Sequence, residues 1–302
     1  MSDTKLWSYY DGCSEGAVKD GARFKLGLIS THLWSQFVEY QLNYYPPYCE
    51  LEKIVNFTTE ACDPLDGRVD GVVSRTHLCK LHFNLNSTIG CGEILNGAHD
   101  NMGRRIYMSY QPTAQFQDAV TSYNETTGEY GPFEGVTRDT FRDWIATGFQ
   151  RYYDSLETTW PDLSVWQKSD PQVPTAGSVR YYESARSIMY PHLSYNQSVA
   201  KLNNWYRLFL VPGGAHCGAN TLQPNAPWPE TTLATLIDWV ENGIEPKTLN
   251  GTIQSTGEQQ QICGWPLRPY FKNNATNPEC VYDQKSLDTW KYNLNAFKMP
   301  IF

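Results

Sequence analysis

The chain of 302 residues lacks several features that would place it in a functional class at once. It has no run rich in Lys and Arg, and its formal net charge is -8 at pH 7. Both facts argue against a nucleic acid or an anionic membrane surface as its partner. No apolar stretch approaches the ~18–20 residues that a membrane-spanning helix needs. Without repeats or low-complexity tracts, the chain is long enough for one large domain or two with a substantial core.

An export signal is also missing, because Met1–Lys5 and the residues after it form no hydrophobic segment. The rest of the chain has the composition of an exported protein. Its 8 cysteines are an even number, as expected for disulfide pairs in an oxidising compartment. Asn-x-Ser/Thr sequons occur at Asn56, Asn86, Asn124, Asn196, Asn250 and Asn274. We therefore expect a secreted glycoprotein whose front segment is missing.

Aromatic residues are abundant, with 20 Tyr, 12 Phe and 10 Trp. Most of them will pack in the core or on the surface, because aromatic rings bury large apolar areas. The alternative is a surface that binds carbohydrates or phenols, since flat rings stack on sugars and on arenes. Composition alone assigns this role to no position.

The segment Gly12-Cys13-Ser14-Glu15-Gly16 follows a short apolar and aromatic run, Leu6–Tyr10. Its G-x-S-x-G spacing is typical of the sharp strand-to-helix turn that exposes the nucleophilic serine of an α/β-hydrolase. The glycines on both sides allow neighbouring backbone to pass close by. Ser14 is therefore the candidate nucleophile, although the motif alone is a weak signal.

A nucleophilic serine needs a histidine base and a carboxylate that orients this base. His216 follows a predicted buried strand in a glycine-rich turn, which suits an exposed imidazole, whereas none of the other five histidines follows so clear a strand. Asp170 is the best candidate for the acid, and Asp162 is its rival. The order Ser14, Asp170, His216 along the chain is that of α/β-hydrolases.

Cysteines adjoin both the nucleophile and the base, as Cys13 next to Ser14 and Cys217 next to His216. If the serine and histidine meet within hydrogen-bond distance, the neighbouring Cα atoms can fall within the ~4.4–6.8 Å that a disulfide requires. A Cys13–Cys217 bridge would then hold the catalytic geometry. Pairing elsewhere remains the alternative, since eight cysteines allow about 105 connectivities.

A second group of polar residues lies between Cys62 and Val72. Three aspartates broken by glycines form a loop of hard oxygen ligands suited to Ca²⁺, although it is not an EF-hand. Side chains of Asp63, Asp66 and Asp70 and the backbone carbonyls of Arg68 and Val72 are the candidate ligands. A solvated acidic turn is the alternative, and a Cys62–Cys79 bridge would brace the loop.

Regular patterns predict several elements. We expect a strand, turn and helix up to about residue 33, a helix over 137–153, a helix over 177–190, a buried strand over 205–211 and a helix over 233–240. Between Tyr45 and about Trp160 the chain is otherwise predicted to be loop-rich. After Pro246 it is polar and is predicted to end in a loop.

Together these motifs resemble the fungal tannase and feruloyl esterase family, and its tannase branch most closely. The stretches that carry the resemblance are Tyr9–Gly16, Cys62–Val73, Asp170–Pro174 and Val211–Cys217, with Tyr44–Pro47, Tyr110–Thr113, Asp238–Gly243 and Cys263–Pro269 also similar. The resemblance implies an α/β-hydrolase core with an inserted lid domain. It implies a core over 1–44, a lid with the calcium loop over 45–160 and the remaining core over 161–302.

The resemblance also implies roles for particular residues. Ser14, Asp170 and His216 are expected to be the nucleophile, acid and base of an esterase that hydrolyses small phenolic acid esters. The calcium ligands are expected to be Asp63, Asp66, Arg68, Asp70 and Val72, with Arg68 and Val72 acting through backbone oxygen. The expected bridges are Cys13–Cys217, Cys62–Cys79, Cys263–Cys280 and Cys49–Cys91. The motifs do not separate galloyl from feruloyl esters and indicate no oligomeric state.

Departures from the family pattern leave a second hypothesis open. Family members carry a long segment before the nucleophile turn, and after Gly16 this chain departs from their sequence at Ala17–Asp20. The family's strand before Asp170 is also missing. We therefore expect a truncated core that lacks its N-terminal strands, and loss of an oxyanion donor would reduce turnover by about 10²–10³. The alternative is an inactive homologue that retains a calcium-stabilised lid binding glycans or phenols.

Overall fold

The computed structural model describes residues 6–8, 34–84, 91–100, 102–105, 108, 110–116, 121–132, 137, 139, 140, 142, 143, 146, 147, 175–215 and 218–293. Its helices are α3 (Tyr48–Cys62), α4 (Thr76–His82), α5 (Cys91–Asn96), α7 (Thr175–Met189), α8 (Tyr195–Asn203), α9 (Thr232–Glu241) and α10 (Gln284–Thr289), with residues 34–42 also helical. Short 3₁₀ helices are η1 (Asp63–Asp66) and η3 (Lys272–Asn274).

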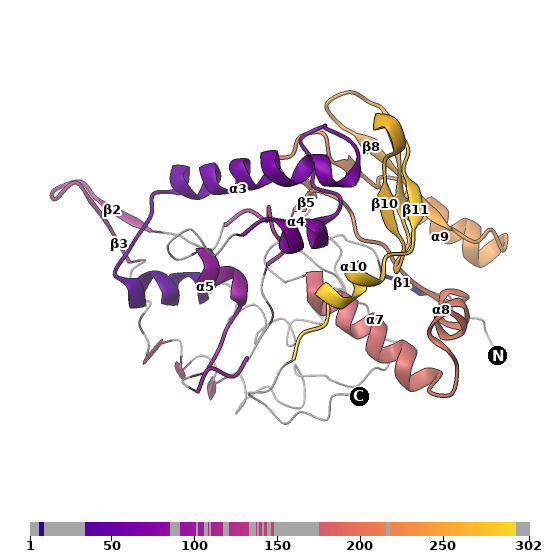
Figure 1. The fold of residues 1–302 in the computed structure, drawn as a ribbon, viewed down its shortest axis with the longest axis horizontal. Coiled ribbons are helices and arrows are strands. Elements are labelled where there is room, and N and C mark those ends of the chain that lie inside the picture. Colours follow the sequence, from indigo (N-terminus) through magenta and orange to yellow (C-terminus); the bar gives the residue numbers. More distant parts are fainter. Residues whose placement is uncertain are drawn as a thin grey trace.

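The strands are short and form several small sheets. They are β1 (Leu6–Ser8), β2 (Ser122–Asn124), β3 (Glu129–Gly131), β4 (Tyr206–Leu208), β5 (Gly214–Ala215), β6 (Gly218–Ala219), β7 (Pro227–Trp228), β8 (Thr248–Ile253), β9 (Gln259–Cys263), β10 (Arg268–Tyr270) and β11 (Glu279–Val281). β1 and β4 pair in parallel, whereas β2–β3, β5–β6, β7–β8–β9 and β10–β11 are antiparallel. In Figure 1, α3 runs along one side and α7 along the other, with α4 and α10 between them.

The predicted strand over 205–211 is confirmed in β4, whose residues are all buried. Tyr206 and Leu208 belong to a core cluster in which α7 and α8 cover this strand, for example through Tyr182 and Leu202, each 0% exposed. The predicted helix over 177–190 is confirmed as α7 and begins slightly earlier. A continuous apolar run is what a strand buried on both faces requires, so this core was readable from the sequence.

The helix predicted over 233–240 is confirmed as α9, which ends before Asn242 and Gly243 as expected. Gly243 has φ 68°, the left-handed conformation that commonly terminates helices. Trp239 is the residue that α9 buries completely, and it packs with Leu249 of β8 and Phe209. α9 is therefore held to the core mainly by one indole.

The prediction of a loop-rich stretch after Tyr45 was wrong at α3. Pro46 and Pro47 had favoured a loop, but proline is well tolerated where a helix begins, and Pro47 is the N-cap of α3. The helix buries a stripe of side chains three to four residues apart, namely Leu51, Val55, Thr58, Thr59 and Cys62. Within this stripe, Leu51 and Val55 pack against the helical residues Trp34 and Val38.

The tail after Pro246 was predicted only as a polar stretch that ends in a loop, and no strand was predicted in it. Residues 294–302, at its end, lie outside the described part of the chain. After Pro246 the chain forms β8 and β9, then β10, β11 and α10. Burial alternates along β8, with Leu249, Gly251 and Ile253 inside, which is the period of two that a strand imposes. Asn, Gln and Gly are poor strand formers, and they masked this alternation.

Two other predictions lie partly within the described residues. The strand predicted over Leu6–Tyr10 is confirmed at β1, whereas the turn and helix after it fall outside the described part of the chain. Residues 139, 140, 142, 143, 146 and 147 are helical, in agreement with the helix predicted over 137–153. In the described part of the chain, no helix is long and apolar enough to span a bilayer.

Candidate active site and acidic loop

The parallel pairing of β1 with β4 brings together two segments that are far apart in sequence. Trp7 lies opposite Arg207, and Ser8 lies opposite Leu208. The carboxyl ends of parallel strands reach the same edge of a sheet, where α/β folds place their ligands. The G-x-S-x-G segment follows β1 and the His216 turn follows β4. These two segments therefore follow, in the sequence, strands that end at the same edge of the sheet.

The base loop, defined here as residues 211–220, follows β4 and contains β5 and β6. Gly214 pairs with Ala219 and Ala215 with Gly218, so two short strands flank positions 216 and 217 in the sequence. Gly213 has φ 57°, and a Cβ atom there would lie 2.6 Å from the Cβ of Ala226. A side chain is thus excluded both by the backbone conformation and by the space available.

A network of buried amides fixes this loop to the turn at Thr113. Asn220 donates from its backbone N to the Gly213 carbonyl (2.8 Å) and from Nδ2 to the Thr113 carbonyl (3.1 Å). Gln223, which is 2% exposed, donates from Nε2 to the Thr113 hydroxyl (3.1 Å). Thr113 has φ 70°, which is strained for a β-branched residue. Such strain persists only where the surroundings enforce it, and it is common at functional sites.

Gln223 also connects this network to Val73, the residue directly after the aspartate-rich segment 63–72. Its Oε1 accepts a hydrogen bond of 2.9 Å from the backbone N of Val73. A cavity of about 80 Å³ lies beside these groups, with Gly213 and Gly214 on one wall and Gln111 on another. The Nε2 of Gln111 is buried and has no hydrogen-bond partner among the described residues. One glutamine therefore links Val73, the strained turn and the base loop.

The acidic loop, defined as residues 63–72, folds around its own carboxylates. Asp63 accepts hydrogen bonds from the backbone N of Asp70 (3.3 Å) and of Gly71 (2.9 Å). Asp66 accepts from Arg68 N and Ser74 N, each at 3.0 Å. Asp63 and Asp66 are only 4% and 1% exposed. The sequence here is thus a buried acidic turn rather than a solvated one.

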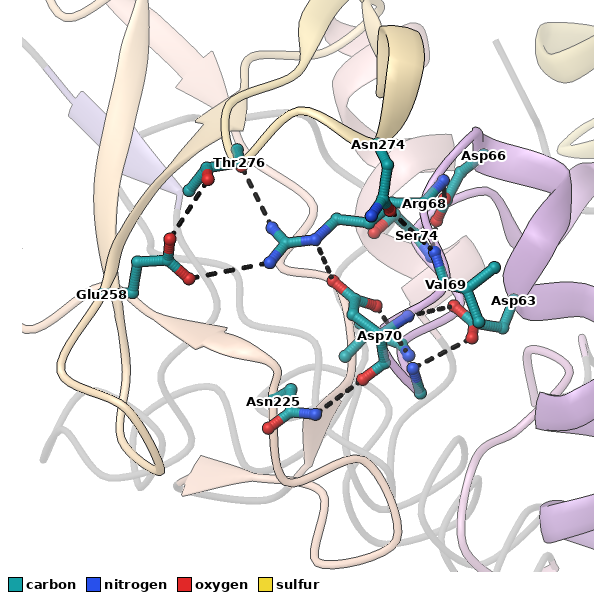
Figure 2. Close-up of polar contacts among 12 residues, drawn as sticks. Asp63, Asp66, Arg68, Val69, Asp70, Ser74, Asn225, Glu258, Asn274 and Thr276 are labelled. Atoms are coloured by element: carbon teal, nitrogen blue, oxygen red, sulfur yellow. Dashed lines mark hydrogen bonds and ion pairs between the residues drawn. The ribbon is translucent and has the colours of Figure 1, made fainter.

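Distant parts of the chain hold this loop in place, as Figure 2 shows. The guanidinium of Arg68 contacts Asp70 (Nε to Oδ2, 3.0 Å), Glu258 (3.7 Å) and the carbonyl of Thr276 (3.2 Å). Asn225 donates to the carbonyl of Asp70 at 2.7 Å. These contacts come from the C-terminal part of the chain, so the loop is integrated in the fold.

The electrostatics of the loop favour a cation. Burial raises the pKa of Asp66 to about 7 and that of Asp70 to about 6, and the charge of Asp63 adds to both effects. Carboxylate oxygens are the ligands that Ca²⁺ prefers, so the donor chemistry fits. Among the described residues, however, no three Asp, Glu, His or Cys side chains converge on one point. Any bound cation would need backbone oxygens as well.

Two of the four disulfides expected from the resemblance are confirmed. Cys62–Cys79 joins the end of α3 to α4 with a Cα separation of 5.2 Å, and Cys263–Cys280 joins β9 to β11 at 5.6 Å. The expected Cys49–Cys91 bridge was wrong, because Cys49 has a free, exposed thiol. Cys49 lies in the first turn of α3, on the face that points to solvent.

The predicted triad itself lies outside the described residues, as do its neighbouring cysteines: Ser14, Asp170, His216, Cys13 and Cys217. Sequence analysis missed Thr113, Asn220 and Gln223, which hold the turn and the base loop together. The only available signal was the Tyr110–Thr113 stretch that had been noted as part of the resemblance. Buried amide networks between distant segments leave no periodic pattern, so the sequence could not reveal these contacts.

The strand arrangement and the solved structures it resembles define the class of protein. The tannin acyl hydrolase from Aspergillus niger superposes with a TM-score of 0.84 and 42% sequence identity, covering 100% of this chain and 69% of that one. An esterase from Aspergillus oryzae superposes with a TM-score of 0.60 at 20% identity, covering 84% and 62%. The predicted fold class is confirmed, because these neighbours are α/β-hydrolases.

The sequence comparisons then give the family. The profile described as "Tannase and feruloyl esterase" matches residues 8–99 and 132–286. A tannase of Aspergillus oryzae is 37% identical over 409 aligned positions, covering 100% of this chain and 69% of the relative. The chain belongs to the tannase and feruloyl esterase family, and is accordingly a carboxylic ester hydrolase. The alternative of an inactive homologue gains no support.

Proposed function

We propose that this protein hydrolyses esters of phenolic acids, with galloyl esters as the first class to test. The observation that supports the proposal is the parallel register of β1 with β4, because the segments with Ser14 and His216 follow these two strands in the sequence. The 37% identity to a tannase, against 27% to a probable feruloyl esterase of Arthroderma benhamiae, favours galloyl over feruloyl esters.

In the proposed mechanism Ser14 attacks the ester carbonyl while His216 takes the proton from its hydroxyl. Asp170 orients His216 and stabilises its charged form. His216 then gives the proton to the alcohol oxygen that leaves, so an acyl-serine and a free alcohol result. Water, deprotonated by the same histidine, attacks the acyl-serine and releases the phenolic acid. We further propose that a Cys13–Cys217 bridge holds the two turns together.

Replacing Ser14 by alanine tests this function. We expect Ser14→Ala to lose more than 10³-fold of the turnover of methyl gallate, because no other group can form the acyl-enzyme. Ser255→Ala is the matched control, since Ser255 is an exposed loop residue that bonds only to Asn225 in the described contacts. Turnover of methyl gallate that survives in a correctly folded Ser14→Ala variant would reject the assignment.

We also propose that the acidic loop binds a structural Ca²⁺. Asp63, Asp66 and Asp70 would supply side-chain oxygens, and Arg68 and Val72 would supply backbone carbonyl oxygens. Support comes from the burial of Asp63 and Asp66 and from the raised pKa values of Asp66 and Asp70, because a divalent cation would offset the cost of these buried charges. The ion would brace the loop that directly precedes Val73, whose backbone N donates to Gln223.

Thermal unfolding with and without calcium tests this proposal. We expect Ca²⁺ to raise the melting temperature of the EDTA-treated protein by several degrees, because a ligand at 100 times its Kd adds about 2.7 kcal/mol. Asp63→Asn should abolish this shift. Asp143→Asn should keep it, because Asp143 lies on the surface, paired with Arg142. A well-folded protein that neither contains nor responds to calcium would contradict the proposal.

We propose that the protein is secreted and glycosylated. The sequons and the two disulfides support an oxidising route. Asn124 is an exposed acceptor in the β2–β3 hairpin, where its Oδ1 accepts a hydrogen bond from the backbone N of Thr126. Treatment of the fungal product with an N-glycosidase should reduce its mass, and an unchanged mass would count against this proposal.

A further inference from the structure

A second and larger cavity, of about 520 Å³, lies between α7 and α10. We call it the α7–α10 groove. Its walls include Arg180 and Glu183 from α7, Trp265, and the rings of Tyr282, Trp290 and Tyr292 around α10. In Figure 1, α10 crosses beside α7. Of the described lining residues, Trp290 borders both the groove and the cavity beside the base loop.

The acidic member of the groove is already neutralised. Glu183 accepts hydrogen bonds from the indole of Trp265 (2.8 Å) and from the hydroxyl of Tyr195 (2.9 Å), and it forms an ion pair with Arg186 (2.9 Å). The ring of Tyr195 also lies 4.4 Å from the guanidinium of Arg186. Glu183 consequently has little capacity left to attract a cationic ligand.

The cation in this groove is not neutralised. Arg180 donates a hydrogen bond of 2.9 Å to the carbonyl of Tyr292, and within the described part of the chain it forms no ion pair with a carboxylate. Burial lowers the pKa of Arg180, and no opposing charge offsets this. A half-buried guanidinium without a counter-ion is unfavourable, so an anion bound here would gain from a preformed site.

Further cations surround the same aromatic residues. Lys291 also lines the groove, although it is paired with Asp288 (2.7 Å), and Lys80 donates a hydrogen bond of 2.9 Å to the hydroxyl of Tyr292. Arg105 lies over the Tyr292 ring at 5.6 Å. This face is therefore cationic in a chain whose net charge is -8, which selects for an anionic ligand.

The combination of rings and a guanidinium selects one chemical class. An aryl carboxylate can lay its ring against the tyrosine and tryptophan side chains while its carboxylate accepts two hydrogen bonds from arginine. A neutral sugar would leave Arg180 uncompensated, and inorganic phosphate would leave the rings unused. The volume lies within the ~300–1,000 Å³ of small-molecule sites and accommodates a single-ring acid.

We propose that the α7–α10 groove is a second, non-catalytic site that binds a free aromatic carboxylic acid, with Arg180 as the anchor. The natural ligand would be the phenolic acid that the ester hydrolysis releases, and this identification rests on the proposed function. The groove would then hold product away from the base loop. Binding itself requires no catalysis and involves no covalent step.

Calorimetric titration with gallate tests the site. We expect Arg180→Gln to weaken gallate binding at this site at least tenfold, because the charged hydrogen bonds are lost, while the initial rate of methyl gallate hydrolysis stays unchanged. Arg142→Gln is the matched control, since Arg142 is an exposed arginine paired with Asp139 and Asp143. Methyl gallate, which has no carboxylate, should bind this site more weakly than gallate does.

A second variant guards against misfolding of Arg180→Gln. Tyr282 is 48% exposed, and Tyr282→Ala should weaken gallate binding without disturbing the core. Gallate binding that is identical in the wild type and in both variants would overturn the proposal, as would equal affinity for the methyl ester. Failure of the Ser14→Ala test would instead reject Ser14 as the nucleophile and leave the binding result unaffected, because the calorimetric readout does not depend on turnover.

Discussion

At the scale of single residues, the base loop depends on a few positions whose identity the local geometry dictates. Gly213 combines a left-handed backbone with a contact that leaves no space for a Cβ atom. Thr113 adopts φ 70° although it is β-branched, and Gln223 and Asn220 both donate to it. Strain of this kind costs about 1–3 kcal/mol. The buried hydrogen bonds offset that cost and hold the turn against the base loop.

Substitution of Gly213 by alanine should therefore destabilise the protein. The new methyl group would lie 2.6 Å from the Cβ of Ala226 on a backbone with φ 57°, and we expect a loss of about 1–3 kcal/mol. Gly218→Ala is a matched control in the same loop, because a Cβ atom there meets nothing within 4 Å. Equal urea midpoints for the two variants would show that Gly213 is not constrained in this way.

The candidate residues differ in how far they could be read from the sequence. The acidic loop was predictable because its aspartates and glycines are adjacent in the chain. The Cys62–Cys79 pairing was expected from the family resemblance, and the two cysteines flank that loop. The role of Gln223 was not, because Val73 and Thr113 are distant in sequence and a lone glutamine is a common surface residue. Ser14 and His216 remain predictions.

At the scale of elements, a cluster of ionisable side chains joins α4 to α10. His77 is 0% exposed, and its Nε2 lies 3.1 Å from Asp283, the residue that caps the N-terminus of α10. Arg75 pairs with the same carboxylate, and the buried Arg268 is close by. Burial, together with the charges of Arg268 and Arg75, lowers the pKa of His77 to about 3.

This histidine should make stability depend on pH. Its pKa is about 3 in the folded protein against 6.5 in the unfolded chain. Above pH 6.5 it is neutral in both states. Below pH 6.5 only the unfolded chain binds the proton, so the free energy of unfolding falls until about pH 3. Each unit of pKa difference corresponds to about 1.4 kcal/mol.

The variant His77→Gln isolates this contribution, because glutamine does not titrate and Asp283 keeps a hydrogen-bond donor beside it. Urea denaturation at pH 7.5 and at pH 4.5 should show wild type more stable at the higher pH. The difference between wild type and variant should shrink as the pH falls. A difference that stays constant with pH would contradict the lowered pKa of His77.

Elements with strong periodicity were the predictable ones. β4, α7 and α9 were found because a continuous apolar run and an amphipathic pattern identify them locally. α3 was missed because two prolines suggested a loop, although Pro47 is in fact the N-cap of the helix. β8 and β9 were missed because glutamine and asparagine occupy many of their positions, including the buried Gln260, and concealed the alternation of buried residues.

At the scale of the whole molecule, β4 is the point where the beginning, the middle and the end of the chain meet. It pairs with β1 from the N-terminal segment. On the C-terminal side, Trp265 donates its backbone N to the carbonyl of Leu208 at 2.7 Å, and Phe209 bridges to Gly264. No local pattern encodes such long-range pairing. The division at residues 44 and 160 remains a prediction from the family resemblance.

This convergence supports the proposed active site, because the segments that carry Ser14 and His216 follow two strands that end at the same edge of one sheet. The chain spans 69% of the length of the tannase that it resembles. Hydrolysis of phenolic esters by the present chain is therefore the proposal that most needs a direct structural test. The two cysteines beside Ser14 and His216 offer one.

Mass-spectrometric mapping of the non-reduced protein tests most directly whether Ser14 and His216 meet. We expect a proteolytic fragment in which the Cys13 peptide is linked to the Cys217 peptide, and which separates on reduction. The Cys62–Cys79 and Cys263–Cys280 links serve as internal standards. Finding Cys13 joined to Cys49 or Cys91 instead, while both standards are intact, would contradict the proposed active site.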